Sequence, residues 1–94
     1  MKTITIKVEK KKNWADQVYI EFTTEKDGAV AEVDYPDTDI PGREKPRLYA
    51  IAFDCASPVD FDTIEETIAA AKEVCETYYK GEGYDKVEFD MRAV

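Results

Sequence analysis

The chain has 94 residues, of which 44% are apolar and 36% charged, and this composition predicts a single folded domain over residues 1–94. It has no histidine, which excludes Ser-His-Asp and Cys-His catalysis, and its formal net charge of −8 disfavours nucleic acids, whose phosphates repel an acidic surface. No apolar run is long enough to cross a bilayer, and the N-terminus lacks the apolar core of a signal peptide, so we expect a cytoplasmic protein without membrane contact.

Two alternating segments begin the chain. Residues 3–9 and 17–23 alternate polar and apolar side chains, the pattern of a half-buried strand. The polar residues 10–13 between them predict a turn, so the two strands should form a hairpin. Beside this turn, Trp14 and three lysines make a basic-aromatic cluster. The cluster either contacts a phosphate or an acidic partner, or it is a solvated turn that discourages edge pairing.

The Asp27-Gly28 pair is a hairpin signal, because glycine accepts positive φ, and it predicts a third strand over residues 29–35. Alternation places Ala31, Val33 and Tyr35 on the buried face of this strand.

Residues 34–46 hold three of the four prolines and have neither helical nor strand periodicity. We expect a surface loop that its prolines stiffen for contact, with a plain connector across the sheet as the alternative. The spacing of Asp34, Asp37 and Asp39 offers oxygen ligands for Ca²⁺ or Mg²⁺, but the glycine and the distal glutamate of an EF-hand loop are missing. Solvated carboxylates in Asx turns are therefore the expectation, without a bound metal.

Residues 47–53 are apolar on both faces, which predicts a central strand that is covered on both sides. Either the loop over residues 36–46 folds back over its second face, or a second copy of the chain covers it in a symmetric homodimer.

Residues 60–80 predict a helix that Gly81 ends. Asp60 is the expected N-cap, and Asp62 with Glu65 offers a competing capping box. Apolar residues at three- and four-residue steps should form the buried stripe: Phe61, Ile64, Ile68, Ala71, Cys75 and Tyr78.

A last strand over residues 85–93 should turn Val87, Phe89 and Met91 inward. The element order β-β-β-β-α-β then predicts an α+β fold: a two-layer sandwich in which one helix packs on one face of a five-stranded, mainly antiparallel sheet.

Cysteine and carboxylate chemistry offers little for catalysis. Cys55 and Cys75 are expected as free thiols, with a disulfide as the alternative, and without histidine a zinc site would need carboxylate ligands. The acidic pairs near the helix start, Glu65 with Glu66 and Asp60 with Asp62, are explained by their favourable interaction with the helix dipole. We predict no catalytic, metal-binding or cofactor-binding residue.

Two segments, FDTIEETIAAAKEV and GYDKVEF, resemble the helix-then-strand ending of many small bacterial and phage proteins. In those proteins an F-D-[ST]-x-E-E start leads from a sheet into one packing helix. The small size, the α+β organisation and the acidity also resemble anti-CRISPR and anti-restriction proteins of mobile elements. The resemblance implies a fold and a type of protein, and no site residues carry over from it.

These features together predict a non-enzymatic protein-interaction module, an inhibitor or regulator from a mobile element, whose acidic surface binds a basic partner. The candidate contact residues are Asp34, Tyr35, Asp37, Asp39, Ile40, Glu65, Glu66, Glu73 and Glu76. One alternative is a small-molecule-binding domain with a pocket between helix and sheet, lined by Phe53, Phe61 and Tyr78. Another is a hydrolase that uses carboxylates and a divalent ion.

Overall fold

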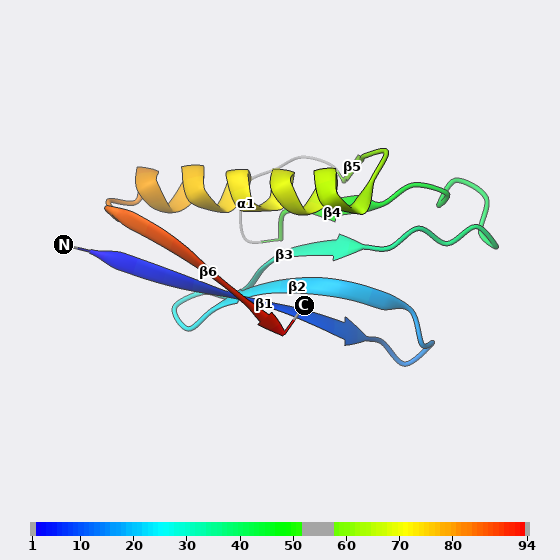
Figure 1. Ribbon diagram of the computed structural model, residues 1–94, viewed down its shortest axis with the longest axis horizontal. Helices are drawn as coiled ribbons and strands as arrows, with labels where there is room; N and C mark the ends of the chain where they lie inside the picture. Colours follow the sequence, from blue (N-terminus) through cyan, green and yellow to red (C-terminus); the bar gives the residue numbers. More distant parts are fainter. Residues whose placement is uncertain (1, 52–57, 94) are drawn as a thin grey trace.

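The computed structural model describes residues 2–51 and 58–93, in which one helix lies along one face of a twisted sheet (Figure 1). The elements are β1 (Thr3–Lys12), β2 (Val18–Thr24), β3 (Gly28–Asp34), β4 (Arg47–Tyr49), β5 (Val59–Asp60), α1 (Ile64–Gly81) and β6 (Lys86–Ala93). The strand order is β5-β4-β3-β2-β1-β6, and neighbours are antiparallel except β1 and β6, which are parallel. The predicted α+β sandwich is confirmed, with a sixth strand and one parallel pair in addition.

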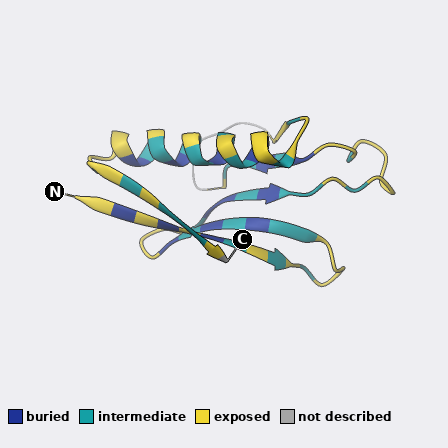
Figure 2. Ribbon diagram, in the orientation of Figure 1, coloured by how far each residue is buried: buried dark blue, intermediate teal, exposed yellow. Residues whose placement is uncertain are grey.

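The core lies between the sheet and α1, and alternation in the first strands explains it. Ile4, Ile6 and Val8 of β1 are buried while the residues between them are exposed, which produces the banded colouring of β1 in Figure 2. Ile20 and Phe22 of β2 continue the same buried layer. The helix-free face is correspondingly polar.

A β-bulge changes the predicted pattern of β3. The register shifts between Phe22 and Thr23, which pair with Ala31 and Ala29, so Val30 has no direct partner on β2. Val30 and Ala31 are both fully buried as a result, whereas strict alternation predicted only Ala31. Tyr35, also predicted inward, is half-buried against the core.

The fourth strand is where the prediction was wrong. β4 has three residues and lies next to the edge of the sheet, between β3 and β5. Among residues 47–51, which the structure describes, only Leu48 is buried, and Ile51 is 55% exposed. The last two residues of the predicted strand lie outside the described ranges. The loop after β3 extends past the end of the sheet instead of folding back over β4 (Figure 1).

The N-cap of the helix lies three residues later than predicted, at Thr63 instead of Asp60. Asp60 belongs to β5, where its carboxylate pairs with Arg47 across the ladder (Nε–Oδ1 2.6 Å), and Asp62 pairs with Lys45 at 2.9 Å. The N-cap is Thr63, whose Oγ1 accepts the backbone N–H of Glu66 at 3.1 Å. The two aspartates predicted as caps are thus held by cations of the loop and of β4.

The buried stripe of α1 also differs in part from the prediction. Its fully buried residues recur at four-residue steps: Thr67, Ala71, Cys75 and Tyr79. Tyr79 therefore replaces Tyr78 as the buried tyrosine. Its hydroxyl donates to Asp27 Oδ2 at 2.7 Å and lies 3.4 Å from Thr24 Oγ1, which fastens the end of α1 to the β2–β3 turn.

A Schellman motif ends the helix. Gly83, at φ 100°, donates its N–H to the carbonyl of Lys80, and Tyr84 donates to that of Tyr79, each at 3.1 Å. The Tyr84 and Tyr79 rings meet edge to face at 5.7 Å and supply the hydrophobic contact of this motif. Gly81, predicted to end the helix, is its last residue.

The two glycines at this end predict opposite effects of one substitution. Gly83→Ala should lower the free energy of unfolding by about 1–2 kcal/mol, because a Cβ disfavours the left-handed conformation. Gly81→Ala should leave it unchanged or raise it by up to about 1 kcal/mol, since Gly81 is helical and nothing lies within 4 Å of an added Cβ. Urea unfolding measures both; a loss of equal size in the two variants contradicts the Schellman assignment.

Candidate functional site

A pocket of about 500 Å³ lies at the end of the sheet, where the β1–β2 turn approaches the loop after β3. Both segments project from the same end of the molecule (Figure 1). The lining combines carboxylates, side-chain amides, aromatic rings and one guanidinium: Asn13, Asp16, Gln17, Val18, Tyr19, Glu32, Asp34, Tyr35, Pro36, Asp37 and Arg43. We call this cavity the sheet-end pocket.

The β1–β2 turn forms one rim of the sheet-end pocket and presents an exposed tryptophan. Asn13 Oδ1 accepts the backbone N–H groups of Ala15 at 2.8 Å and of Gln17 at 3.1 Å, an Asx arrangement that closes the turn. Asp16 adopts φ 60° within it. The side chain of Trp14 is 98% exposed. The turn is therefore ordered by hydrogen bonds while its largest side chain lies in water.

The loop after β3 forms the opposite rim and is linked to the turn. Gln17 Nε2 donates to Asp37 Oδ2 at 3.3 Å, and Asp37 Oδ1 accepts the N–H of Asp39 at 3.1 Å in the predicted Asx turn. The N–H of Asp37 donates to the carbonyl of Arg43 at 2.7 Å, which closes the loop on itself. Two segments distant in sequence thus make one preformed surface.

Strand register places a row of glutamates on the helix-free face, and Glu32 of this row reaches the pocket. Glu32 lies opposite Glu21 on β2, and Glu21 lies opposite Glu9 on β1. Asp34 follows Glu32 on the same face, two residues along β3. Like charges directly opposite each other destabilise a sheet.

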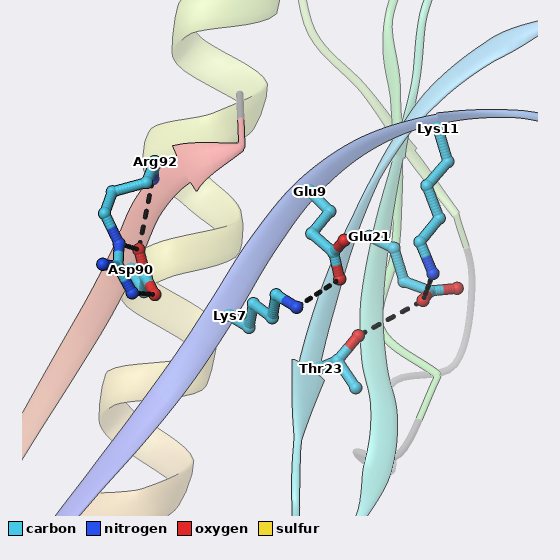
Figure 3. Close-up of polar contacts among 7 residues, drawn as sticks. All are labelled: Lys7, Glu9, Lys11, Glu21, Thr23, Asp90 and Arg92. Atoms are coloured by element: carbon cyan, nitrogen blue, oxygen red, sulfur yellow. Dashed lines mark hydrogen bonds and ion pairs between the residues drawn. The ribbon is translucent and has the colours of Figure 1, made fainter.

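Cations offset three of these four carboxylates. Lys7 lies 3.6 Å from Glu9 on β1, and Lys11 of β1 lies 2.8 Å from Glu21 on β2 (Figure 3). Arg43 Nη2 lies 3.2 Å from Asp34 Oδ2.

Glu32 makes no ion pair with any residue in the described ranges. A hydrogen bond to Asp34, partial burial and the negative charges of Asp34 and Glu21 raise the pKa of Glu32 to about 8. A pKa of about 8 favours the protonated form of the Glu32 carboxyl at neutral pH.

The candidate contact residues fall into two groups. Asp34, Tyr35 and Asp37 line the sheet-end pocket, with Asp39 and Ile40 exposed in the loop beside it. The four glutamates lie on α1, in the other layer of the sandwich, where Glu66 accepts a hydrogen bond from Thr63 and Glu76 pairs with Lys80: Glu65, Glu66, Glu73 and Glu76.

The pocket residues that sequence reasoning missed come mostly from long-range pairing. Alternation does put Glu32 on the outer face of its strand, but it does not show which residue lies opposite. Arg43 carried no signal of its own within the proline-rich loop. Asn13 was predicted as part of a turn and Gln17 as the first residue of a strand, and Asp16 lies between these two segments.

Of the three residues predicted to line the alternative site between helix and sheet, the structure describes Phe61 and Tyr78. Tyr78 lines a shallow hollow of about 360 Å³ on the flank of α1, with Ala70, Glu73, Val74 and Thr77. Phe61 packs against the edge of the core before the helix begins. The third predicted residue, Phe53, lies outside the described ranges.

Of the two cysteines, Cys75 is a free thiol on the buried side of α1, and burial raises its pKa to about 12. Such a thiol is a core residue and a poor nucleophile. Cys55 lies outside the described ranges.

Within residues 2–51 and 58–93, no group of three acidic or thiol side chains is arranged to hold a metal ion, and no helix is apolar over the length of a bilayer. The chain matches no known protein family, no curated protein and no solved structure. The resemblance to proteins of mobile elements therefore stays a hypothesis.

The Glu32 carboxyl predicts a particular dependence of stability on pH. Its pKa is about 8 in the folded protein and ordinarily 4.5, so the folded state binds the extra proton and the free energy of unfolding falls as pH rises from about 4.5 to 8. Glu32→Gln keeps a hydrogen-bond donor next to Asp34 and removes the titration. Urea unfolding from pH 5 to 9 should show a shallower decline in this variant than in the wild type.

Glu73→Gln, an exposed change on α1, is the matched control and should keep the wild-type decline. Identical profiles for the wild type and Glu32→Gln would contradict the assignment of a raised pKa to Glu32.

Proposed function

We propose that the protein is a non-enzymatic interaction module whose sheet-end pocket binds a basic segment of a partner protein. The observation that supports this most is the composition of the pocket: Asp16, Asp34 and Asp37 surround a space of about 500 Å³ that also contacts Tyr19 and Tyr35. Pockets of about 300–1,000 Å³ accept small organic groups, so one arginine or lysine side chain fits this one. Carboxylates and aromatic rings are the groups that bind guanidinium and ammonium ions.

One ring of the pocket already has a cation beside it within the chain. Lys10 Nζ lies 5.3 Å from the ring centroid of Tyr35. This distance is within the range of a cation–π contact. It supports the inference that the aromatic walls attract positive charge from a partner as well.

Trp14 supplies the apolar contact that such an interface needs. Buried tryptophans are among the side chains that contribute most to protein binding, and a tryptophan also stacks on guanidinium groups. Because the hydrogen bonds that Asn13 Oδ1 accepts order the turn beforehand, little conformational entropy is lost when a partner covers Trp14. Trp14 belongs to the same turn as Asn13, Asp16 and Gln17, which line the pocket.

The overall charge favours the same class of partner. Residues 13–94 carry eight basic and twenty acidic side chains, and the whole chain has a net charge of −8. A field of this sign attracts basic proteins over long range and speeds their association at low ionic strength. Inhibition or regulation of a basic protein by occupying its surface is consistent with this arrangement and requires no catalytic group.

Binding of an arginine-rich peptide tests this function. A nonapeptide with four arginines should bind the wild type at 50 mM NaCl and at least about tenfold more weakly at 500 mM, because salt screens exposed charges. Trp14→Ala and Asp37→Asn should each weaken binding by about fivefold or more. Fluorescence anisotropy of a labelled peptide measures all of these affinities.

Glu73→Gln is the control for general electrostatics, because it removes one negative charge on α1, away from the pocket. Its affinity should stay within about twofold of the wild type. Salt-independent binding, or an equal loss in Glu73→Gln and Asp37→Asn, would rule out the pocket as the binding site. Binding of free arginine amide as tight as that of the peptide would instead assign the pocket to a small cationic ligand.

A further inference from the structure

Glu32, which lines the sheet-end pocket, belongs to a group of carboxyl side chains on the sheet whose other members are paired with cations of the chain. Four carboxyl groups lie together on the helix-free face, and Lys7, Lys11 and Arg43 pair with three of them. The fourth, Glu32, has a hydrogen-bonded proton in place of a cation.

Within the described ranges, the cations on the strands next to Glu32 are already paired with other carboxylates. From β2, Glu21 faces it and is paired with Lys11. From β4, Tyr49 faces it, and the neighbouring Arg47 is bound through two nitrogens to Asp60, at 2.6 and 3.3 Å.

The remaining charged neighbours of Glu32 in the described ranges are already paired as well. Along β3 the neighbour is Asp34, and the loop contributes Arg43, whose Nη2 is bound to Asp34. Beyond Glu21, β1 contributes Glu9 with its partner Lys7. Lys7, Lys11, Arg43 and Arg47 therefore each already have a carboxylate partner.

We propose that a cationic side chain of the partner takes the place of this proton, so that binding at the sheet-end pocket releases one proton from Glu32 and strengthens as pH rises. The inference rests on the proposed function, because it requires that a basic segment enters the pocket. The Glu32 O–H bond breaks, the proton passes to the buffer, and the guanidinium or ammonium group then lies between two ionised carboxylates, Glu32 and Asp34.

Two further observations support the exchange. A carboxyl with a pKa of about 8 loses its proton at pH 7 for only about a tenfold cost in affinity, which a charge-assisted hydrogen bond recovers. In addition, Arg43 Nε is buried and has no hydrogen-bond partner within the described residues. Arg43 lines the same pocket, and a backbone carbonyl of a bound peptide would satisfy this donor if the guanidinium turns toward the peptide on binding. This unsatisfied donor favours a peptide over a simple cation.

The direction of the pH effect follows from the linkage. Below pH 8 the free protein has to lose the proton in order to bind, so Kd should fall by close to tenfold per pH unit between pH 6 and 8. Above pH 8 the affinity should level off, because Glu32 is already ionised in the free protein. Arginine remains charged throughout this range.

Isothermal titration calorimetry of the wild type provides the test. The probe is the four-arginine peptide with an acetylated N-terminus and an amidated C-terminus, because a free α-amino group would itself titrate near pH 8. Titrations at pH 7 in phosphate and in Tris, whose ionisation enthalpies differ, give the number of protons released. We expect close to one proton per peptide. Glu32→Gln should release none, and its Kd should not change between pH 6 and 9.

Asp37→Asn is the matched variant: it should bind more weakly than the wild type and keep both the proton release and the pH slope. Salt-sensitive peptide binding with no proton release and a flat Kd between pH 6 and 8 overturns the proton exchange and leaves the proposed function standing. Absence of peptide binding at every pH overturns both.

Discussion

One strand register accounts both for the core and for the charge cluster of this protein. It pairs Ile20 with Val33 under α1 and, one residue along, Glu21 with Glu32 on the helix-free face. Because side chains alternate between faces, a slip of one residue would separate the glutamates only by moving the buried apolar side chains into water. Burial of each such side chain is worth about 1.5–3 kcal/mol. Like charges directly opposite each other destabilise a sheet, but the paired cations and the protonation of Glu32 reduce this cost, so the core determines the register.

Three cations and a proton offset the repulsion among these carboxyl groups. One of the resulting contacts also holds a wall of the pocket in place. Arg43 belongs to the loop after β3, and its ion pair with Asp34 attaches that loop to the sheet. The bond between Gln17 and Asp37 then links the loop to the β1–β2 turn. The contact that neutralises one carboxylate thus holds one wall of the pocket, and Glu32 remains as the carboxyl without a cation. The position of the loop and the proposed binding therefore both depend on the charges of the carboxyl groups on the helix-free face.

Local patterns in the sequence predicted most of the elements, and long-range pairing explains the rest. Alternation identified β1, β2 and β6 and put Glu32 on an outer face, while periodicity identified α1. The bulge beside Phe22 sets which residues of β2 and β3 meet, and no local pattern reports it. β5 has two residues, too few for a strand signal, and its pairing with β4 removed Asp60 from the helix start. The pocket was only half predicted because its two walls are brought together by tertiary contacts.

The central claim is that the register set by the core holds Glu32 close to Glu21 and Asp34. The ionisation of the Glu32 side chain tests this claim most directly. Carbon-detected NMR of the side-chain carboxyl groups follows each titration in the free wild-type protein. The account predicts a titration midpoint for Glu32 near pH 8. A midpoint near the ordinary value of 4.5 would contradict it.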